Sequence, residues 1–555
     1  MKKNSWKTLF CVIFAVFISI PIILPYFHKG FFPTHDGQWA VVRAGDMFRQ
    51  LKDLQIPPRY SGNLNFGYGY PLFNFAYPFP YYLATLLHIF HIGFVSSVKI
   101  LFALSVPLSA ISMFLLAKEL WKNTASAVIS SILYVYLPYR LVDLYARGSL
   151  GESISFVLFP LLFYVSLKMT RSQNPLFFTS LGAILLGILI TTHNIMAILF
   201  LPVLIVFIFI IYTCARKSFL PYVLSLFLGL GASAFFWLPA LLEKQYIILS
   251  KIPIADRNLY FVKPLQLIIP RFGYGLPTSA DGFSYQIGIP HLLFFFVVLA
   301  LLIIHYKKRK KTNQELFIFA FALSAVTCVM TLLLFSPTNI IWKNMPLLSE
   351  INYPWTLLAV IGFLISLLSG FLATLGKKFV YISFFIAGLA IVLVFPYAKP
   401  QYYVNNPDTY YLTNDATTTS SSEYMPAWVG TNPTSRNNQK VVITDGSATL
   451  ENIRYNSKNV SFSGNFQSNA SARINTIYYP GWKVFVDGKE AAVSYLDSNG
   501  LMDFPISSGS HQVVARLSET PLRLFSDFVS LATVVLLLFF LSLRPLSVFM
   551  THKKK

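Results

Sequence analysis

The first residues that suggest chemistry are a histidine and an aspartate that follow the first apolar stretch of the chain. His35 and Asp36 stand in the run Thr34-His35-Asp36-Gly37, a few residues beyond the apolar stretch 9–27. A carboxylate held at the outer face of a membrane protein can act on lipid-bound substrates. Asp36 is therefore our first candidate for a catalytic residue, and His35 beside it is a candidate substrate contact.

Helical spacing after Asp36 places a cation on the same side of the chain. If Asp36 begins a helix, then Asp36, Arg43 and Gln50 share one stripe. A carboxylate and a guanidinium would then face whatever occupies the cavity beneath. The alternative is that Asp36 only caps the helix, because aspartate is a preferred N-cap residue. Arg43 would then pair with Asp46 at helical spacing.

A second group of charged residues lies between two short apolar stretches. It comprises Arg140, Asp143, Arg147 and Glu152. Arginine suits phosphate recognition, because its planar guanidinium can engage two oxygens at once. We expect Arg140 and Arg147 to hold a lipid phosphate or pyrophosphate, with Asp143 and Glu152 orienting them. The alternative is a set of ion pairs within the protein.

Three further residues are candidates for substrate contacts. His193 stands in a tight turn between two apolar stretches, where it can contact substrate or cap the following helix. Lys263 and Arg271 fall in a long outer loop and are additional phosphate candidates. Plain surface charge is the alternative for these two residues.

The elements that must position these residues are membrane-spanning helices. The 555 residues are 55% hydrophobic, 16% aromatic and 12% charged, with a mean hydropathy of +0.58, which is too apolar for a soluble chain. Apolar stretches of roughly 20 residues cross the hydrocarbon core, and their number here predicts about twelve transmembrane helices. We place them near 8–27, 98–117, 125–138, 153–168, 176–192, 195–213, 219–241, 289–306, 316–335, 355–374, 379–397 and 524–543.

Basic residues set the expected orientation. Clusters of Lys and Arg fall at every second connection, and short cytoplasmic loops are enriched in these residues. This alternation predicts a multi-pass protein of the plasma membrane with both termini in the cytoplasm, surrounded by membrane lipids. The net charge of +22 owes much to these clusters, so we do not expect nucleic-acid binding.

The last outer region has a different composition. The stretch Asn459-Val460-Ser461-Phe462-Ser463 alternates polar and apolar residues, as half-buried strands do. Asp487-Gly488 follows the alternating stretch 482–486 and is a hairpin-turn signal. These patterns predict a small β-sandwich-like domain outside the membrane. Its aromatic residues Tyr478, Tyr479 and Trp482 can contact glycan or, as in most small β domains, form the core.

The expected fold class is therefore an α-helical polytopic membrane protein with an outer β-rich domain near the C-terminus. We expect a transmembrane domain with outer loops in 1–398 and an extracytoplasmic β domain in 399–521. A final transmembrane helix and a basic cytoplasmic tail follow in 522–555. The Thr and Ser run 417–422 is typical of a flexible linker.

Several familiar chemistries have no support in the sequence. The chain has no P-loop glycine pattern, no His-Glu-x-x-His helix and no Gly-x-Ser-x-Gly elbow. The predicted spans also lack the buried charges expected of an ion-coupled transporter. Nucleotide-driven transport, zinc proteolysis and ordinary hydrolase chemistry are therefore not expected.

Several motifs together resemble the GT-C class of membrane glycosyltransferases. They are the acidic loop after the first span, Gly67-Tyr68-Gly69-Tyr70-Pro71-Leu72-Phe73, Pro138-Tyr139-Arg140, and Asn352-Tyr353-Pro354-Trp355 at the start of a late span. The chain looks similar to bacterial membrane proteins labelled as related to 6-pyruvoyl-tetrahydropterin synthase, and to their YfhO-like relatives. The stretch 478–489 is similar to the terminal domain of the YfhO-like group.

The resemblance implies an enzyme that takes a sugar from a polyprenyl-phosphate carrier at the outer membrane face and transfers it to an acceptor. The acceptor can be a glycan, a lipid or a protein. Asp36 matches the first-loop acidic position of that class, where the carboxylate acts as general base or helps to hold a divalent cation. Cationic groups stabilise the departing phosphate, a role that we expect of Arg140 and Arg147.

Two positions depart from the pattern of that class. Thr356 stands where relatives often carry Arg after the Pro-Trp pair, which puts one phosphate contact in doubt. His35 stands in place of a second carboxylate, so a divalent metal lacks a clear ligand cluster and the cofactor is unknown. The rival hypothesis is a non-catalytic protein that binds or translocates a lipid-linked glycan.

Overall fold

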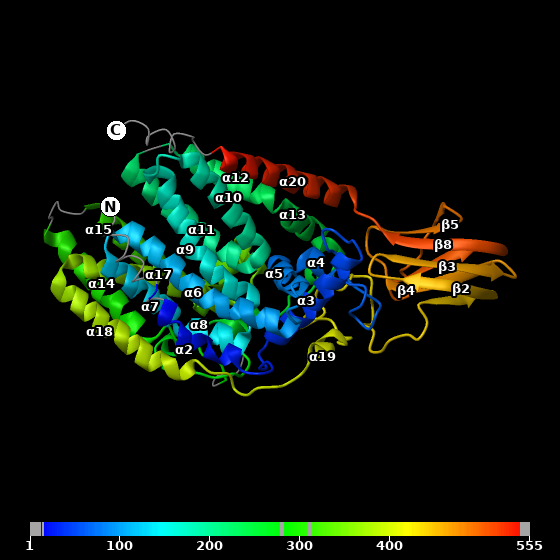
Figure 1. Ribbon diagram of the computed structural model, residues 1–555, viewed down its shortest axis with the longest axis horizontal. Coiled ribbons are helices and arrows are strands. Elements are labelled where there is room, and N and C mark those ends of the chain that lie inside the picture. Colours follow the sequence, from blue (N-terminus) through cyan, green and yellow to red (C-terminus); the bar gives the residue numbers. More distant parts are fainter. Residues whose placement is uncertain (1–12, 14–15, 217, 278–281, 309–313, 544–555) are drawn as a thin grey trace.

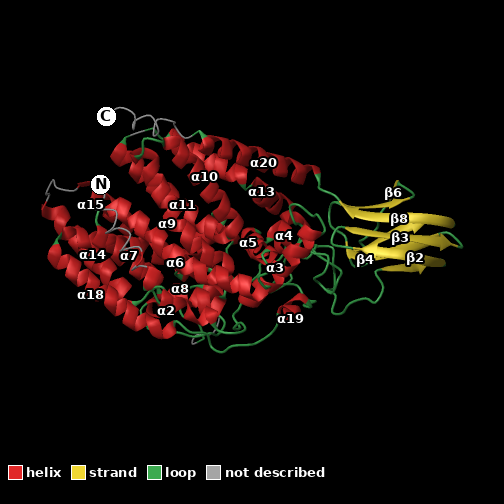
Figure 2. Cartoon of the chain, viewed as in Figure 1, coloured by secondary structure: helices red, strands yellow, loops and turns green. Residues whose placement is uncertain are grey.

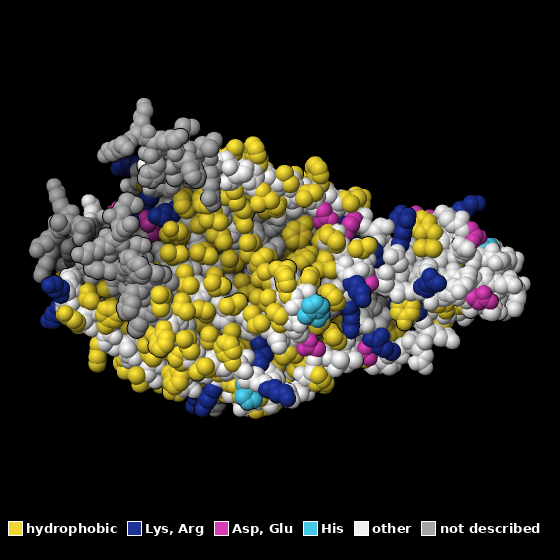
Figure 3. Space-filling model, in the orientation of Figure 1, with side chains coloured by type: hydrophobic (Ala, Val, Ile, Leu, Met, Phe, Trp, Pro, Cys, Tyr) yellow, Lys and Arg dark blue, Asp and Glu magenta, His cyan; other side chains and the backbone are white. Residues whose placement is uncertain are grey.

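The protein is a bundle of helices that carries a β domain at one end (Figures 1 and 2). The computed structural model describes residues 13, 16–216, 218–277, 282–308 and 314–543. Hydrophobic side chains cover most of the visible surface of the bundle, whereas the β domain presents mainly other residues (Figure 3). A broad apolar surface of this kind is what a lipid bilayer covers in a helical membrane protein. The chain is therefore a polytopic helical membrane protein with a C-terminal β domain.

The long helices agree with the predicted spans. They are α6 (Phe94–Trp121), α7 (Thr124–Val135), α9 (Leu150–Arg171), α10 (Pro175–Thr192), α11 (Asn194–Ala215), α12 (Leu220–Ala232), α13 (Ala234–Leu242), α14 (Ile289–Lys308), α15 (Gln314–Leu332), α17 (Leu357–Leu372), α18 (Lys377–Val394) and α20 (Pro521–Ser542). Among the described residues, 8 helices can cross a membrane, or up to 10 if each bent pair is one span. The predicted count is higher because it included 289–306, where only the shorter apolar stretch Ile289–Ile304 of α14 is described in full, and 8–27, which lies partly outside the described residues.

Basic residues that follow α6 and α9 meet at the same end of the bundle. Glu119 lies 2.6 Å from Lys168 Nζ and 3.3 Å from Arg171 Nη1. Arg171 also reaches Glu315 at the start of α15, at 2.6 Å. Connections that we expect in the cytoplasm therefore share one end of the bundle. The side of the membrane on which this end lies stays a prediction.

Shorter helices pack between the bundle and the β domain. The first loop forms α3 (Gly37–Lys52), α4 (Leu72–Phe75) and α5 (Phe79–Ile89). The helix α19 (Asp408–Leu412) contacts α3 from the other end of the sequence. Because Ala40, Ala44 and Met47 are buried, α3 packs inside the protein rather than lying on the bilayer surface.

The β domain is built from two antiparallel sheets. One sheet has the order β1 (Val441–Asp445), β4 (Ala470–Ile477), β7 (Leu501–Ile506); the other has the order β2 (Ala448–Tyr455), β3 (Asn459–Phe466), β8 (Gly509–Leu517), β5 (Trp482–Val486), β6 (Lys489–Ala491). Ile474 and Phe504 from the first sheet share one core with Phe462 and Val484 from the second. Residues 399–440 precede the first of these strands.

Local sequence patterns correctly placed the hairpin of this domain. Val486 pairs with Lys489 across the β5–β6 turn, as the Asp487-Gly488 signal predicted. Both turn residues have positive φ, 48° at Asp487 and 81° at Gly488, which is the backbone of a type I′ turn. Glycine and aspartate tolerate this conformation better than most residues.

The aromatic residues of the domain belong mainly to its core. Tyr479 and Trp482 are 1% and 3% exposed, so the core alternative holds for them. Tyr478 is half-buried, and its ring stacks on Tyr495 with centroids 4.1 Å apart. The structure thus gives the buried pair no surface on which to contact a glycan.

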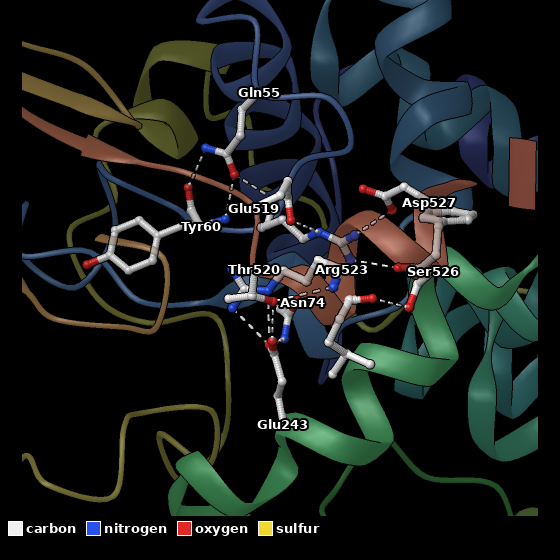
Figure 4. Close-up of polar contacts among 12 residues, drawn as sticks. Gln55, Tyr60, Asn74, Glu243, Glu519, Thr520, Arg523, Ser526 and Asp527 are labelled. Carbon is white, nitrogen blue, oxygen red and sulfur yellow. Dashed lines mark hydrogen bonds and ion pairs between the residues drawn. The ribbon is translucent and has the colours of Figure 1, made fainter. Parts of the chain in front are cut away.

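Buried charges attach the β domain to the bundle through α20 (Figure 4). Arg523 Nη2 lies 2.8 Å from Glu243 Oε2, and the same carboxylate accepts a hydrogen bond from Asn74 at 2.8 Å. Arg59 Nη2 lies 2.7 Å from Asp527 on the next turn of α20. A buried ion pair is weak support for stability but fixes geometry, because a shifted partner would leave a charge unpaired. These contacts therefore set where the β domain stands over the bundle.

Candidate functional site

Asp36 stands at the N-terminus of α3, but a different side chain caps the helix. Thr34 Oγ1 accepts the hydrogen bond from the Gly37 N–H at 2.9 Å. Among the described residues, the Asp36 side chain makes no capping hydrogen bond, and it is 48% exposed. The capping alternative therefore does not describe Asp36, and its carboxylate is open to a substrate.

The Asp36 cavity, a hollow of about 150 Å³, lies beside this carboxylate. Its lining comprises Asp36, Trp39, Ala40, Arg43, Tyr77, Tyr81, Gly148, Leu150, Thr418, Thr419, Ser420 and Glu423. The shared helical stripe correctly brought Asp36 and Arg43 to one cavity. Gln50, the third member of that stripe, lines another cavity nearer the β domain.

The guanidinium of Arg43 is held by neutral partners. Its Nε donates to Thr418 Oγ1 at 3.0 Å, and Nη1 donates to the Tyr81 hydroxyl at 3.2 Å. A third hydrogen bond runs from Nη2 to the Thr418 carbonyl. Asp46, the alternative partner, accepts a hydrogen bond from Gln50 at 2.7 Å instead. Arg43 therefore brings positive charge to the cavity wall, and its hydrogen bonds in the described structure go to neutral groups rather than to the cavity carboxylates Asp36 and Glu423.

The Thr and Ser run that we read as a flexible linker is one wall of the Asp36 cavity. Thr418 is 1% exposed and bonds to Arg43. The Thr418 N–H also donates to the Tyr70 hydroxyl at 3.2 Å. Its composition suggested a linker, but long-range hydrogen bonds that composition cannot reveal hold this segment in place.

Backbone hydrogen bonds join the first loop to the segment that ends at Arg147. The Asp36 N–H donates to the Arg147 carbonyl at 2.7 Å, and the His35 N–H donates to the Ala146 carbonyl at 3.0 Å. Gly148 follows with a φ of +67°, and a Cβ there would lie 2.8 Å from the Gly37 nitrogen and collide with Thr34. The close approach of the two segments therefore requires glycine.

The charged residues of 139–152 are buried in helices rather than exposed in an outer loop. They lie in α8 (Pro138–Val142), in the π-helix Asp143–Arg147 and at the start of α9. Arg140, Asp143 and Glu152 are all 0% exposed. We expected only that this segment connects two spans, and the sequence did not show that its charged side chains are buried. The cause is that α7 continues past a 42° bend into this segment, which short apolar stretches did not indicate.

Within this group, the two arginines have different surroundings. Arg147 Nη2 lies 3.8 Å from Asp36 Oδ2, and Nη1 contacts Glu152. Its guanidinium also lies over the Trp355 ring, 4.7 Å from the centroid. Arg147 therefore belongs to the site, with Glu152 holding it.

Arg140 points to a different set of partners. Its Nη2 donates to Ser105 Oγ at 2.6 Å and its Nη1 to the Ser153 carbonyl at 3.1 Å, while Asp143 lies 3.5 Å away. Asp143 in turn accepts a hydrogen bond from Ser153 Oγ at 2.5 Å. Arg140 and Asp143 thus form the internal ion-pair arrangement that was the alternative to phosphate binding.

Both candidate histidines make hydrogen bonds within the protein. His35 Nε2 lies 3.2 Å from the Tyr274 carbonyl, and burial lowers the pKa of this imidazole. His193 Nδ1 accepts a hydrogen bond from the Met196 N–H at 3.3 Å and so caps α11. Burial lowers the pKa of His193 to about 3. The capping alternative holds for His193, whose ring stacks on Tyr77 of the cavity wall at 4.9 Å.

The remaining candidates lie apart from Asp36. Lys263 is exposed and precedes the short helix Pro264–Leu267. Arg271 is also exposed, and its carbonyl accepts a hydrogen bond from Gln286 at 2.8 Å. The described lining of the Asp36 cavity includes neither residue.

Most residues of the cavity lining escaped the sequence reading. Among them are Tyr77, Tyr81, Thr418 and Glu423. Tyr81 lies in α5, whereas Tyr77 precedes this helix, and their rings stack with centroids 6.0 Å apart. Glu423 and Thr418 come from the far end of the chain, so no local spacing relates them to Asp36.

The cavity does not present the ligand set of a metal centre. Asp36 and Glu423 line it, but among the described residues no three His, Cys, Asp or Glu side chains gather as ligands. His35 faces the Tyr274 carbonyl rather than Asp36. Divalent cations prefer several oxygen ligands, so this donor set does not fit one by itself, and we derive no step through a metal.

Two motifs of the resemblance have structural roles around this site. The Gly67-Tyr68 backbone holds the β domain, because the Tyr68 carbonyl accepts from the Ile477 N–H at 2.8 Å and the Gly67 carbonyl accepts from Lys440 Nζ at 2.9 Å. Thr356, which replaces the expected Arg, donates to the Tyr353 carbonyl at 2.7 Å. The ring of the neighbouring Trp355 makes the cation–π contact with the Arg147 guanidinium.

Comparison with known proteins gives distant similarities. No protein-family model matches the chain. An uncharacterised protein of Lactococcus lactis subsp. cremoris (strain MG1363) is 24% identical over 243 residues, which are 41% of this chain and 39% of that protein. This chain therefore matches well under half of that relative.

Two solved enzymes are distant structural matches. Arabinofuranosyltransferase AftD from Mycobacteria matches with a TM-score of 0.46 and 13% identity over 71% of this chain and 26% of its own. The oligosaccharyltransferase of Archaeoglobus fulgidus with a tethered acceptor peptide matches with a TM-score of 0.40 and 14% identity over 76% of this chain and 60% of its own. This chain spans less than two thirds of either enzyme.

Proposed function

We propose that the protein is a membrane glycosyltransferase that moves a sugar from a polyprenyl-phosphate-linked donor to an acceptor hydroxyl at the outer membrane face. The observation that carries the proposal is the half-exposed Asp36 carboxylate, which opens into a cavity beside Arg147 and Arg43. A base and cations at one small site are what this transfer requires.

Each group has a defined task in the reaction. The acceptor oxygen attacks the anomeric carbon while the bond from that carbon to the phosphate oxygen breaks. Asp36 takes the proton of the acceptor hydroxyl, and the phosphate leaves with the bonding electron pair. Positive charge near the departing oxygen stabilises the charge that develops there. Asp36 is thus the general base of the proposed mechanism.

Arg43 is the stronger candidate for the phosphate contact. Its hydrogen bonds go to the neutral groups of Thr418 and Tyr81, so its charge is not offset there. Arg147 already contacts the buried Glu152 carboxylate and lies near Asp36. We therefore assign Arg43 to the leaving phosphate and Arg147 to the positioning of Asp36, in place of the phosphate role that we expected of Arg140 and Arg147.

The size of the Asp36 cavity limits what it holds. Its volume of about 150 Å³ is below the ~300 Å³ at which sites for whole small molecules begin. The cavity therefore accommodates the reacting groups, while the rest of the donor and the acceptor extend beyond it. The apolar surface of the bundle provides a place for the lipid of the donor (Figure 3).

Mass spectrometry of membrane glycans and lipid-linked sugars tests the proposal. Cells would express wild type, Asp36→Asn or Asp497→Asn, with equal protein levels confirmed. Asp497 is an exposed aspartate of the β domain, so its variant makes the same chemical change away from the site. We expect Asp36→Asn alone to remove one sugar from an acceptor and to accumulate its lipid-linked donor. Unchanged profiles would instead favour binding or translocation of a lipid-linked glycan without transfer.

A further inference from the structure

A second and larger hollow, which we call the seam cavity, lies between α3, the first loop and the β domain. Its volume of about 310 Å³ lies at the lower end of the ~300–1,000 Å³ typical of ligand sites. Among the described residues, its lining shares none with the Asp36 cavity. It is therefore a separate place at which a molecule can bind.

Side-chain amides dominate the lining of the seam cavity. They belong to Asn63, Asn437, Asn438, Gln439, Asn456 and Asn475. An amide offers a donor and an acceptor side by side, which is the pattern that neighbouring hydroxyls of a sugar ring present in return. Phe66, Tyr68 and Tyr455 add aromatic surface on which the C–H face of such a ring can rest.

One buried side-chain oxygen of the seam cavity lacks a hydrogen-bond donor among the described residues. Gln50 is 0% exposed, and its Nε2 donates to Asp46 Oδ2 at 2.7 Å. Its Oε1 has no hydrogen-bond partner in the part of the chain that the structure describes. Buried acceptors are rarely left unpaired in proteins. A hydroxyl group that enters the cavity would supply the missing donor.

Three of the four cations of the lining are already engaged by the protein, and the fourth, Lys52, is exposed. Lys440 Nζ donates to the carbonyls of Gly67 and Asn475, each at 2.9 Å. Arg436 Nε donates to Asp415 at 2.7 Å, and Arg49 donates to the Leu412 carbonyl at 2.9 Å. Burial and the neighbouring Arg436 lower the pKa of Lys440 to about 7. The cavity is therefore better suited to neutral hydroxyls than to a free phosphate.

We propose that the seam cavity binds a neutral, polyhydroxylated saccharide. Its place relative to Asp36 indicates which part of a substrate this would be. At 1.5 Å per helical residue, Gln50 lies about 20 Å from Asp36 along the axis of α3. If the protein transfers sugar as proposed above, the seam cavity holds a part of the acceptor glycan remote from the reacting hydroxyl. Only that assignment rests on the proposed function, because saccharide binding itself needs no reaction.

Binding to the purified full-length protein in lipid nanodiscs tests this inference. The probes are a panel of soluble neutral oligosaccharides of defined linkage, together with inorganic phosphate, and thermophoresis reports their affinities. The variants are Asn438→Ala, on an exposed loop, and Tyr455→Ala, whose ring is 64% exposed. Tyr402→Ala is the matched control, because Tyr402 is 54% exposed and lies outside the described lining.

We expect at least one oligosaccharide to bind, and each cavity variant to weaken its affinity by about tenfold, while Tyr402→Ala leaves it unchanged. The inference is overturned if no oligosaccharide of the panel binds, if the cavity variants bind as wild type does, or if only phosphate binds. Asp36→Asn should bind the oligosaccharide normally. If transfer depends on Asp36 but wild type binds no oligosaccharide, only the saccharide inference fails; if wild type binds an oligosaccharide but Asp36→Asn leaves the glycans unchanged, only the proposed transfer fails.

Discussion

The carboxylate of Asp36 lies 3.8 Å from the guanidinium of Arg147, and the backbones of the same two residues are joined by a 2.7 Å hydrogen bond. The main-chain bond fixes the side-chain distance, so the pair does not depend on two flexible side chains finding each other. Glu152 holds Arg147 from the buried side. The base of the proposed reaction is thus positioned by the fold before any substrate arrives, as efficient catalysis requires.

Asp36 and Thr34 should have opposite effects on activity and stability. Asp36→Asn should lower transfer by about 10²–10⁴-fold, the usual contribution of a general base. Because Thr34 caps α3, Asp36→Asn should change the free energy of unfolding by less than about 0.5 kcal/mol, whereas Thr34→Val should cost about 1 kcal/mol. Thermal unfolding of the purified variants measures the two stability changes, and mass spectrometry of the lipid-linked sugars measures transfer. A larger stability loss for Asp36→Asn would return this residue to a capping role.

Gly148→Ala should damage the site through the backbone. The φ of +67° is unfavourable for alanine, and the new methyl group would collide with Thr34, so we expect a loss of about 1–3 kcal/mol in stability together with reduced transfer. Gly388→Ala is the control, because a Cβ there meets nothing within 4 Å. Equal melting temperatures for the two variants would contradict the close approach that we describe.

The roles of Arg43 and Arg140 can be separated by experiment. Arg43→Gln should fold normally but lower transfer by about 100-fold, because a charge near the leaving phosphate is lost. Arg140→Gln should instead lower stability by about 3 kcal/mol, since Asp143 is then left buried without its cation. Gel filtration of detergent-extracted protein measures folding, and the lipid-linked sugar assay measures transfer. A folded but inactive Arg140→Gln would restore Arg140 to the phosphate site.

Attachment of the β domain should depend on pH through Lys440. Its pKa is about 7 in the folded protein and ordinary when unfolded, so the unfolded chain binds more protons between about pH 7 and 10. Stability should therefore rise with pH across this window. Lys440→Met should flatten that rise, whereas Met at the exposed Lys489 should not. Melting curves at several pH values test this, and parallel slopes for wild type and Lys440→Met would refute it.

Local patterns in the sequence predicted much of the architecture. Apolar length located the spans, and the two-residue signal Asp487-Gly488 located a hairpin, because each depends on neighbours in the chain. The same holds for the stripe that brings Asp36 and Arg43 to one cavity. Segments whose structure is set by adjacent residues are those that sequence patterns describe well.

Contacts between distant segments explain what the sequence did not reveal. The polar run Thr417–Ser422 looked like a linker because its partners, Arg43 and Tyr70, come from the first loop. The segment around Arg140 looked like a connection between spans because the partners that accept its hydrogen bonds, Ser105 and Ser153, lie in α6 and α9 and reach it only when these helices pack together. Neither burial is encoded in local periodicity.

The wall that Thr418 and Glu423 contribute to the Asp36 cavity also has a consequence for biosynthesis. A ribosome makes Asp36 among the first residues of the chain, but it makes the opposite wall only after almost all the predicted spans have been inserted. A nascent or prematurely terminated chain therefore contains Asp36 but lacks the wall that Thr418 and Glu423 contribute to its cavity. The chain would thus become able to carry out the proposed reaction only late in translation, once almost all of its predicted spans are in the membrane.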